Sequence, residues 1–347
     1  MSTWARLADL PVAIERYELE GLAREVSSGF VRKTTVVRLH GGGLDGVGED
    51  VVYTAADHDA LQAAGPVQPL AGTWTLGDFC AHVDGLDLFG YEPGMGEVAR
   101  LYRRWAFHSA ALDLALRQAG RPLHAVLGRE PRPVSFVVSL HEPDPVPSLL
   151  ARYPTLRFKL DASPAWDDAR IAALRATGAV AAIDYKGLYR NTPVDTVAEP
   201  GWYRRVAEGL PDAWLEDPDL SADGIDAVLA PHRDRITWDA PIHAVADIEA
   251  LPFPPRMVNI KPSRLGGLER LCAAYDYCAA HGIGAYGGGQ FELGPGRGQA
   301  QLLAALFHPD GPNDLAPVGF NLPDPPDGLP TSPLPPRPAA TGFRWVD

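Results

Sequence analysis

From residue 131 onward, short apolar runs alternate with amphipathic helical stretches, and this alternation constrains the fold more than any other feature. The runs expected to be strands are SFVVSL, TLRFKLDA, AVAAIDYK, AWLEDP, RITWDAP, MVNIKPS and GIGAYGG, with a weaker eighth, DLAPVGF. Each of the first seven is followed by a segment suited to a helix, such as AWDDARIAALRATG. The alternation predicts an α/β fold in which the strands form a parallel (β/α)7β barrel of the TIM type.

The chain before the barrel has a different pattern. Between residues 12 and 53, the runs IERYELEGL, FVRKTTVVRL and DVVYT predict an antiparallel meander, and from about 98 to 127 apolar residues recur at helical spacing. The sequence therefore predicts an α+β capping domain before the barrel, with a proline-rich segment after it. The expected boundaries are 1–130 for the capping domain, 131–321 for the barrel and 322–347 for the segment, which should pack on the capping domain.

Composition argues against several kinds of partner. Lys and Arg total 31 against 44 acidic residues, a net charge of −13 without a concentrated basic stripe, so nucleic acid is not expected. No apolar run approaches the roughly 20 residues of a membrane span, and the N-terminus lacks the pattern of a secretory signal. We therefore expect a cytoplasmic protein without a membrane partner. Cys80, Cys272 and Cys278 suit neither a disulfide framework nor a metal-binding pair and should be thiols that are buried or have no particular role.

Three carboxylates end consecutive strands of the predicted barrel. Asp184 ends AVAAID, Glu216 ends AWLE and Asp239 ends RITWD. Catalytic groups of parallel barrels lie where strands end, so these acids should converge in the barrel mouth, where they repel one another unless a cation joins them. Oxygen ligands favour Mg²⁺ or Mn²⁺ over Zn²⁺. One such acid is most often an ordinary strand-end residue, but three in succession predict a metal site.

Lysines end the strands on either side of these acids. Lys261 ends MVNIK, and Lys159 lies near the end of LRFK. A nearby metal lowers the pKa of an amine, so that a neutral lysine can remove a proton from carbon while the metal stabilises the enolate. Either lysine alone is also compatible with an ion-paired residue that has no catalytic role.

These motifs resemble those of the enolase superfamily, particularly its muconate-cycloisomerase-like branch. The resemblance rests on KLD, IDYK, WLEDP, TWDAPI and NIKPSRLGGL, and on the spacing between them. GVGED, from Gly46, is similar to the motif that closes the first meander in that family, and the helical segment from Phe107 is similar to the family's helix before the barrel. Nearly the whole chain is covered.

The resemblance implies a site and a reaction. Asp184, Glu216 and Asp239 would bind Mg²⁺, and Lys159 and Lys261 would lie on opposite faces of a small-molecule carboxylate substrate. The chain would then be a lyase or isomerase that abstracts a proton alpha to a carboxylate. The superfamily is also one for which a lysine or histidine base and a magnesium-stabilised enediolate are general features. A homo-oligomer is a further expectation from the family.

Two positions depart from the usual pattern of the branch. It commonly has Lys-x-Lys on the second barrel strand, with the second lysine as base, whereas this chain has Lys159, Leu160 and Asp161. Asp161 should point where that lysine would. Lys186 stands where an asparagine is common, on the adjacent strand. Lys186 therefore either replaces the missing ammonium as a catalytic residue or pairs with Asp161 and leaves Lys261 as the only proton-transfer group.

Other polar residues carry weaker signals. Gln290 and Glu292 follow the seventh strand and should line the barrel mouth with Asp161 as substrate-binding residues. His141 ends the first strand, where a lone histidine is more often a packing or surface residue. By resemblance, loops near 21–30 and 54–64 would close over the substrate.

The expected activity is proton abstraction alpha to a carboxylate to give an enolate. An o-succinylbenzoate-synthase-like dehydratase is the leading interpretation, and a dipeptide or N-acylamino-acid epimerase, a racemase or a cycloisomerase is the alternative. A barrel that binds a metal but has lost its base is an alternative of another class.

Overall fold

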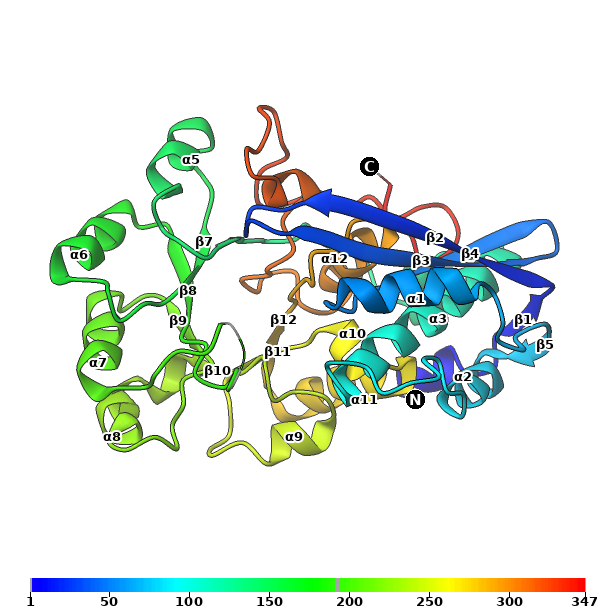
Figure 1. Ribbon diagram of the computed structural model, residues 1–347, viewed down its shortest axis with the longest axis horizontal. Coiled ribbons are helices and arrows are strands. Elements are labelled where there is room, and N and C mark those ends of the chain that lie inside the picture. Colours follow the sequence, from blue (N-terminus) through cyan, green and yellow to red (C-terminus); the bar gives the residue numbers. More distant parts are fainter. Residues whose placement is uncertain (1, 191, 193, 347) are drawn as a thin grey trace.

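The computed structural model describes residues 2–190, 192 and 194–346. An N-terminal layer of antiparallel strands and helices lies beside a ring of parallel strands with helices around it (Figure 1). The expected α/β barrel with an N-terminal α+β part is therefore confirmed.

The N-terminal strands form two antiparallel groups. β2 (Arg16–Glu25), β3 (Val31–Gly41) and β4 (Leu44–Asp50) form the predicted meander, whereas β1 (Pro11–Ile14) pairs with β5 (Gly72–Thr75).

Two expected loops of this region are mostly regular structure. Residues 21–25 continue β2, with Gly21 opposite Thr35 on β3, and residues 55–64 form helix α1 (Ala55–Ala64). The expectation of loops at 21–30 and 54–64 is therefore wrong for half of the first segment and for nearly all of the second. The sequence of α1, AADHDALQAA, is rich in strong helix formers and carries Asp57 in its first turn, which suits a helix N-terminus.

The long helix α3 (Glu97–Gln118) is the core of the N-terminal part and lies against β4. Their close approach depends on Gly48, because a Cβ atom there would be 2.0 Å from the carbonyl oxygen of Ala106. The remaining helices here are η1 (Trp4–Arg6), α2 (Leu76–Asp84) and α4 (Leu123–Leu127).

The barrel strands follow one another around the ring in sequence order. β6 to β10 form one parallel sheet, and β11 and β12 form a parallel pair. Their bounds are Val138–Leu140, Phe158–Asp161, Val180–Asp184, Trp214–Glu216, Ile236–Thr237, Met257–Asn259 and Gly284–Tyr286. The N–H of Asn259 donates to the carbonyl of Trp238 at 2.9 Å and joins β11 to the strand before it. Seven of the eight predicted strands are thus present.

The eighth predicted strand, DLAPVGF, is wrong. Only Asp314 makes a bridge, to Gly288, and a 3-10 helix, η3 (Val318–Asn321), follows. Pro317 lacks the N–H that a strand ladder needs. The ring closes instead through Asn313, whose side chain accepts from the N–H of Gly287 at 2.7 Å and donates to the carbonyl of Ser135 at 2.9 Å.

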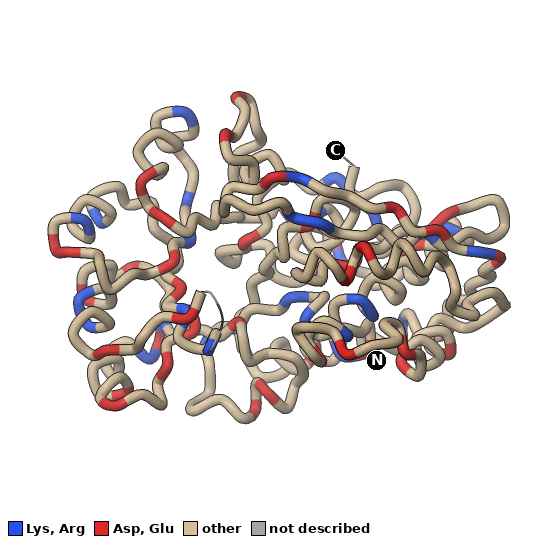
Figure 2. Tube along the Cα trace, in the orientation of Figure 1, with Lys and Arg blue, Asp and Glu red and all other residues tan. Residues whose placement is uncertain are grey.

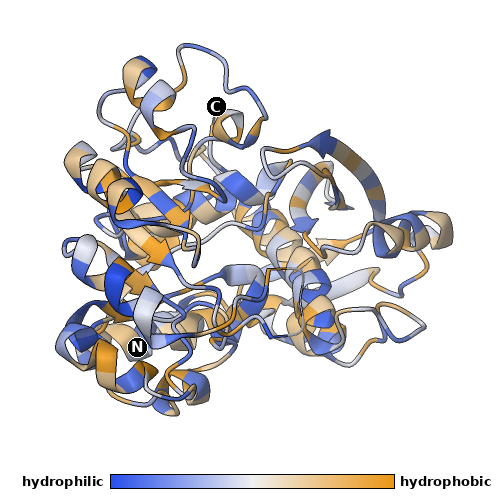
Figure 3. Cartoon of the chain, turned by 60° about the vertical axis from the view of Figure 1, so that its left-hand side comes forward, coloured by the Kyte–Doolittle hydropathy of each residue, from blue (hydrophilic) through white to orange (hydrophobic). Residues whose placement is uncertain are grey.

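Helices surround the ring. Figure 3 shows hydrophobic colouring on the barrel strands and mixed colouring on the helices outside them, as expected for a buried parallel sheet. The helices are α5 (Val146–Arg152), α6 (Asp168–Thr177), α7 (Pro200–Gly209), α8 (Ile225–Leu229), η2 (Ala230–Arg235), α9 (Val245–Glu249), α10 (Pro262–Leu265), α11 (Leu268–His281) and α12 (Pro295–Phe307).

The C-terminal segment contacts both parts of the chain. Leu334 and Val134 exchange backbone hydrogen bonds of 2.8 and 2.9 Å at the start of the barrel. Further on, the N–H of Phe343 and the guanidinium of Arg344 donate to Asp113 on α3, at 2.8 and 2.7 Å. The end of the chain is therefore tied to the N-terminal part.

The distribution of charged residues and the burial of the cysteines agree with what the sequence indicates. Acidic and basic residues are interspersed along the whole trace (Figure 2). Cys80, Cys272 and Cys278 are buried and unpaired, as predicted. Among the helices of the described ranges, none has the length and apolar character needed to cross a membrane.

Candidate active site

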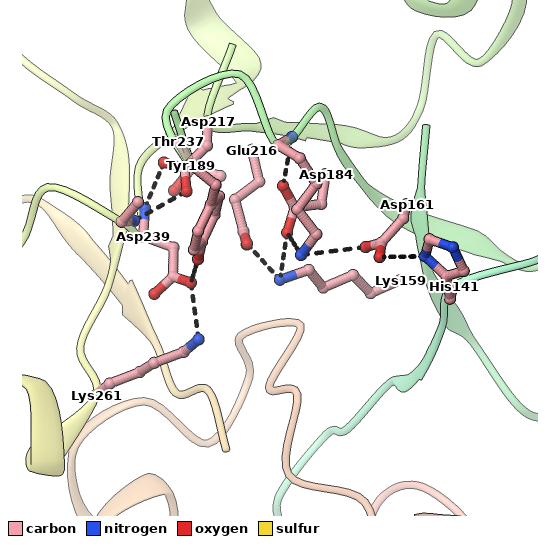
Figure 4. Close-up of polar contacts among 12 residues, drawn as sticks. His141, Lys159, Asp161, Asp184, Tyr189, Glu216, Asp217, Thr237, Asp239 and Lys261 are labelled. Atoms are coloured by element: carbon pink, nitrogen blue, oxygen red, sulfur yellow. Dashed lines mark hydrogen bonds and ion pairs between the residues drawn. The ribbon is translucent and has the colours of Figure 1, made fainter. Parts of the chain in front are cut away.

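The three predicted acids lie at neighbouring strand ends and are buried. Asp184 ends β8, Glu216 ends β9, and Asp239 lies two residues beyond the end of β10. Asp184 pairs in register with Glu216, so the two side chains lie at one level of the ring. All three are at most 1% exposed. Figure 4 shows their carboxylates pointing into one polar cluster.

A fourth acid, Asp217, belongs to this cluster and was missed. Carboxylate oxygens of Asp184, Glu216 and Asp217 lie within 4.8 Å of one another and could hold a metal ion. Asp217 has a φ of +48°, which turns its side chain toward Asp239. Its two oxygens accept from the N–H groups of Asp239 and Ala240, both at 2.8 Å. Asp217 therefore also fixes the backbone that carries Asp239.

Four cationic side chains contact the acids. Lys159 forms ion pairs with Glu216 and, at 3.2 Å, with Asp184. Asp184 also pairs with Lys186 at 2.5 Å. Asp239 pairs with Lys261 at 2.7 Å and with Arg264 at 2.6 Å, and the Tyr189 hydroxyl donates to it at 3.0 Å. Both predicted lysines are thus brought to the acids, together with two cations that the strand-end argument did not select for this contact.

Burial and mutual repulsion set the titration of the acids. Burial raises the pKa of Glu216, as do the carboxylates of Asp184 and Asp239, and Lys159 only partly opposes them, so that the pKa is about 8. Burial also disfavours the Lys159 ammonium, but Glu216 and Asp184 outweigh this and hold the pKa of Lys159 well above its usual value. Negative charge is therefore in excess around Glu216.

Lys261 reaches the cluster across a glycine. A Cβ atom on Gly288 would lie 2.2 Å from Lys261 Cε, so the lysine can take this path only beside a residue without a side chain. Asn259 lies at the same place, two residues before Lys261 and on the same side of the strand. Its amide is 1% exposed, and neither amide atom has a partner among the described residues. Asn259 was not selected from the sequence.

The residues expected to bind substrate lie in two places. Asp161 ends β7 and contacts Lys186 at 3.2 Å and His141 at 3.1 Å, so the expected ion pair between Asp161 and Lys186 is present. Gln290 and Glu292 are buried on the opposite part of the ring. Within the described part of the chain, the Gln290 amide donates to Tyr102 of α3 at 2.8 Å, and Glu292 pairs with Arg297 at 3.0 Å.

The donor set suits a hard divalent cation. The acids are buried, supply only oxygen ligands, and stand at adjacent strand ends. Each carboxylate oxygen has two lone-pair directions, so one hydrogen bond to a lysine leaves a direction for a metal. The residues present therefore fit a divalent metal at this position.

Two family models match nearly all of the chain. They are described as the C-terminal and N-terminal domains of a domain of unknown function, DUF8230, and match residues 130–322 and 5–126. The chain belongs to the DUF8230 family. The DUF8230 description assigns no activity.

Two curated relatives of this DUF8230 protein are enzymes by name. It is 30% identical over 224 residues to the N-succinylamino acid racemase of an Amycolatopsis species, which covers 61% of this chain and 59% of that protein. It is 27% identical over 219 residues to the o-succinylbenzoate synthase of Bacillus subtilis, which covers 60% of this chain and 57% of that protein. The chain thus spans less than two thirds of either relative.

Solved structures share the fold over most of the chain. A member of the enolase superfamily from Listeria innocua has a TM-score of 0.64 at 20% identity and covers 88% of this chain and 86% of its own. The dipeptide epimerase of Enterococcus faecalis has a TM-score of 0.70 at 19% identity, with 96% and 100% covered. The muconate lactonizing enzyme of Pseudomonas putida has a TM-score of 0.70 at 18% identity, with 95% and 96% covered. The resemblance to the enolase superfamily is therefore confirmed for the fold.

Proposed function

We propose that this DUF8230 protein is an enzyme that abstracts the proton alpha to the carboxylate of a small molecule, with Lys261 as base. The observation that carries the proposal is the contact of Lys261 Nζ with Asp239 Oδ2 at 2.7 Å, beside the buried acids. A base next to a site that can hold a divalent cation is the arrangement that enolate formation requires.

Asp184, Glu216 and Asp239 would hold Mg²⁺, or Mn²⁺, and the ion would supply the positive charge that stabilises an enolate. Asp217 would orient Asp239 through its two backbone contacts. Lys159, buried between Glu216 and Asp184, would remain an ammonium and add positive charge on the opposite side of the ring from Lys261. Lys186 would hold Asp161 and Asp184 in place through its two ion pairs.

The leading reaction is elimination of water after proton abstraction, as in the relative named o-succinylbenzoate synthase. Racemisation, as in the relative named N-succinylamino acid racemase, is the second candidate. It is favoured by one observation: polar residues that can exchange protons lie on both sides of the ring, with Lys261 after β11 and His141 after β6.

The test is α-proton exchange in D2O with Mg²⁺, followed by NMR on N-succinylamino acids, dipeptides and succinylated cyclohexadiene carboxylates. We expect exchange of at least one class by the unaltered protein and its loss in Lys261→Ala. Lys33→Ala is the matched control, because Lys33 lies on β3 and pairs with Asp59 at 2.7 Å on the surface. If Mg²⁺ binds but no class exchanges, the proposal fails in favour of a metal-binding barrel without a base.

A further inference from the structure

His141 and Asp161 form a pair at the rim of the barrel. His141 follows β6 and Asp161 ends β7, and His141 Nδ1 lies 3.1 Å from Asp161 Oδ2. The other carboxylate oxygen of Asp161 contacts Lys186 Nζ at 3.2 Å. Asp161 is therefore held from both sides and can keep the imidazole in one orientation, in which Nε2 lies on the side away from Asp161 and 3.9 Å from Glu142 Oε1.

The pair lies across the ring from Lys261. With Asn313 and Asp314 in the eighth position, β7 is second and β11 is sixth, so Asp161 and Lys261 are four positions apart and face each other. Figure 4 shows His141 and Lys261 at opposite ends of the drawn cluster, with Lys159 and Glu216 between them. A flat enolate held among these acids would present one face to each end.

We propose that His141 is the second proton-transfer residue of this site, with Asp161 as the residue that positions it. The inference rests on the proposed function, in the form of its racemisation candidate, and adds a group for the face that Lys261 does not serve. His141 contacts the substrate in this arrangement, whereas Asp161 acts only through the imidazole.

The proton balance of the step is complete. The lone pair of Lys261 Nζ binds the α-proton and the side chain becomes an ammonium, which leaves the electron pair of the broken C–H bond in the enolate. The imidazolium of His141 gives its Nε2 proton to the opposite face of the same carbon and becomes neutral imidazole. Exchange with solvent returns both groups to their starting forms, so no further reactant is needed.

The surroundings of His141 suit a residue that donates a proton to the substrate. Its hydrogen bond to Asp161 raises the pKa of His141 despite partial burial, and Glu142 adds to this effect while Lys186 opposes it. The imidazolium is therefore stabilised at the rim. The side chain is 64% exposed, so a substrate in the barrel mouth can reach Nε2 and solvent can restore its proton.

Lys186 is less well placed for the same step. Its ammonium lies between Asp184 at 2.5 Å and Asp161 at 3.2 Å, and these two carboxylates hold it within the cluster. The geometry assigns Lys186 to charge balance and leaves the rim to His141.

The test uses both enantiomers of N-succinylphenylalanine in D2O with Mg²⁺. The unaltered protein should exchange the α-proton of both. His141→Asn should lose exchange of one enantiomer by about 100-fold or more and keep the other, and Lys261→Ala should show the reverse pattern. His141→Ala should regain the lost exchange when free imidazole is added. His281→Asn, at an exposed histidine on α11, is the control and should exchange both.

The variant Asp161→Asn tests whether Asp161 positions His141 or only supports the fold. It should move the acidic limb of the pH–rate profile to lower pH for the enantiomer that depends on His141, because the imidazolium loses its carboxylate partner. A profile that does not move overturns the role of Asp161.

The remaining outcomes separate this inference from the function on which it rests. Exchange of both enantiomers by His141→Asn at the rate of the unaltered protein overturns the assignment of His141 and leaves the proposed function intact. Exchange of only one enantiomer by the unaltered protein also overturns the assignment of His141 and leaves the proposed function intact. Exchange of neither enantiomer, nor of any other carboxylate, overturns the proposed function and this inference together.

Discussion

The carboxylate of Glu49, on the last strand of the N-terminal meander, accepts a hydrogen bond of 2.9 Å from the N–H of Gly296 at the start of α12. It also accepts from Leu293 at 2.7 Å and from Gly294 at 3.0 Å. Glu49 is 1% exposed. One buried acid thus satisfies backbone donors at a helix start that would otherwise lack partners, and it joins the two parts of the chain.

We expect Glu49→Ala to lower the free energy of unfolding by roughly 2–4 kcal/mol, because it leaves buried N–H groups unsatisfied. Glu49→Gln should lower it less, because its carbonyl oxygen can still accept. It also removes a charge that is disfavoured by burial and by the nearby Glu292, which together raise the pKa of Glu49. Urea unfolding measures both. Glu130→Ala, at an exposed position, is the control. Equal stability of Glu49→Ala and the control would contradict this prediction.

The strand-end residues could be predicted because the barrel repeats one simple relation. An apolar run followed by a helix fixes where each strand ends, and in a parallel sheet those ends meet at one side. Asp184, Glu216, Asp239, Lys159 and Lys261 were all selected in this way. The structure pairs Lys159 with Asp184 and Glu216, and Lys261 with Asp239. For these residues, the position at a predicted strand end was enough to identify them as candidates for the site.

Asp217 could not be selected on the same grounds. A residue directly after Glu216 on a regular strand should point to the opposite side, and only its positive φ turns it toward Asp239. The quoted motif WLEDP contains it, but its letters do not reveal the turn. Such a backbone conformation in a non-glycine residue at a site is a signal that only a structure supplies.

Metal binding distinguishes the roles of Asp217 and Asp239. We expect Asp239→Asn to weaken Mg²⁺ binding more than Asp217→Asn does, because Asp239 would bind the ion directly. Asp217→Asn would lose one of two backbone contacts and should weaken binding about 10- to 100-fold, as for other residues that orient a ligand. Calorimetric titration with Mg²⁺ measures both variants. If Asp217→Asn is the more damaging change, Asp217 is the third ligand.

His308, which contacts the ring-closing residue Asn313, makes the stability of the fold depend on pH. His308 lies beside Asn313, with Nδ1 2.7 Å from Asn313 Oδ1 and Nε2 3.1 Å from the Tyr275 hydroxyl. Burial lowers the pKa of His308 to about 4, from an ordinary value of 6.5. Between these values the unfolded chain binds more protons than the folded one, so His308 favours folding above pH 6.5 and loses this contribution as the pH falls toward 4.

We therefore expect the free energy of unfolding to fall more between pH 7 and pH 4.5 in the unaltered protein than in His308→Gln. The difference should be on the order of 2 kcal/mol, since one pKa unit corresponds to about 1.4 kcal/mol. Urea unfolding at both pH values measures it, with His281→Gln as the control at an exposed site. An equal loss of unfolding free energy in the unaltered protein and in His308→Gln would show that His308 does not titrate in this range.

His141 and Asn259 are two further residues of the site that the sequence alone does not single out. A lone histidine after a strand is most often a surface residue, and only its contact with Asp161 distinguishes His141. Asn259 ends an apolar run like many structural residues. That neither amide atom has a partner among the described residues depends on Gly288, which follows the next strand, and on Lys261, two residues further along the chain.

Asn259 supports the last prediction. A buried amide whose atoms lack partners is unfavourable for stability, so we expect Asn259→Leu, of similar volume, to leave the free energy of unfolding unchanged or to raise it by about 1 kcal/mol. Because the amide lies beside the path of Lys261 at Gly288, the same variant should lower α-proton exchange at least tenfold. Urea unfolding and NMR exchange on one preparation measure both effects. A less stable variant with undiminished exchange would show that Asn259 serves the fold and not the site.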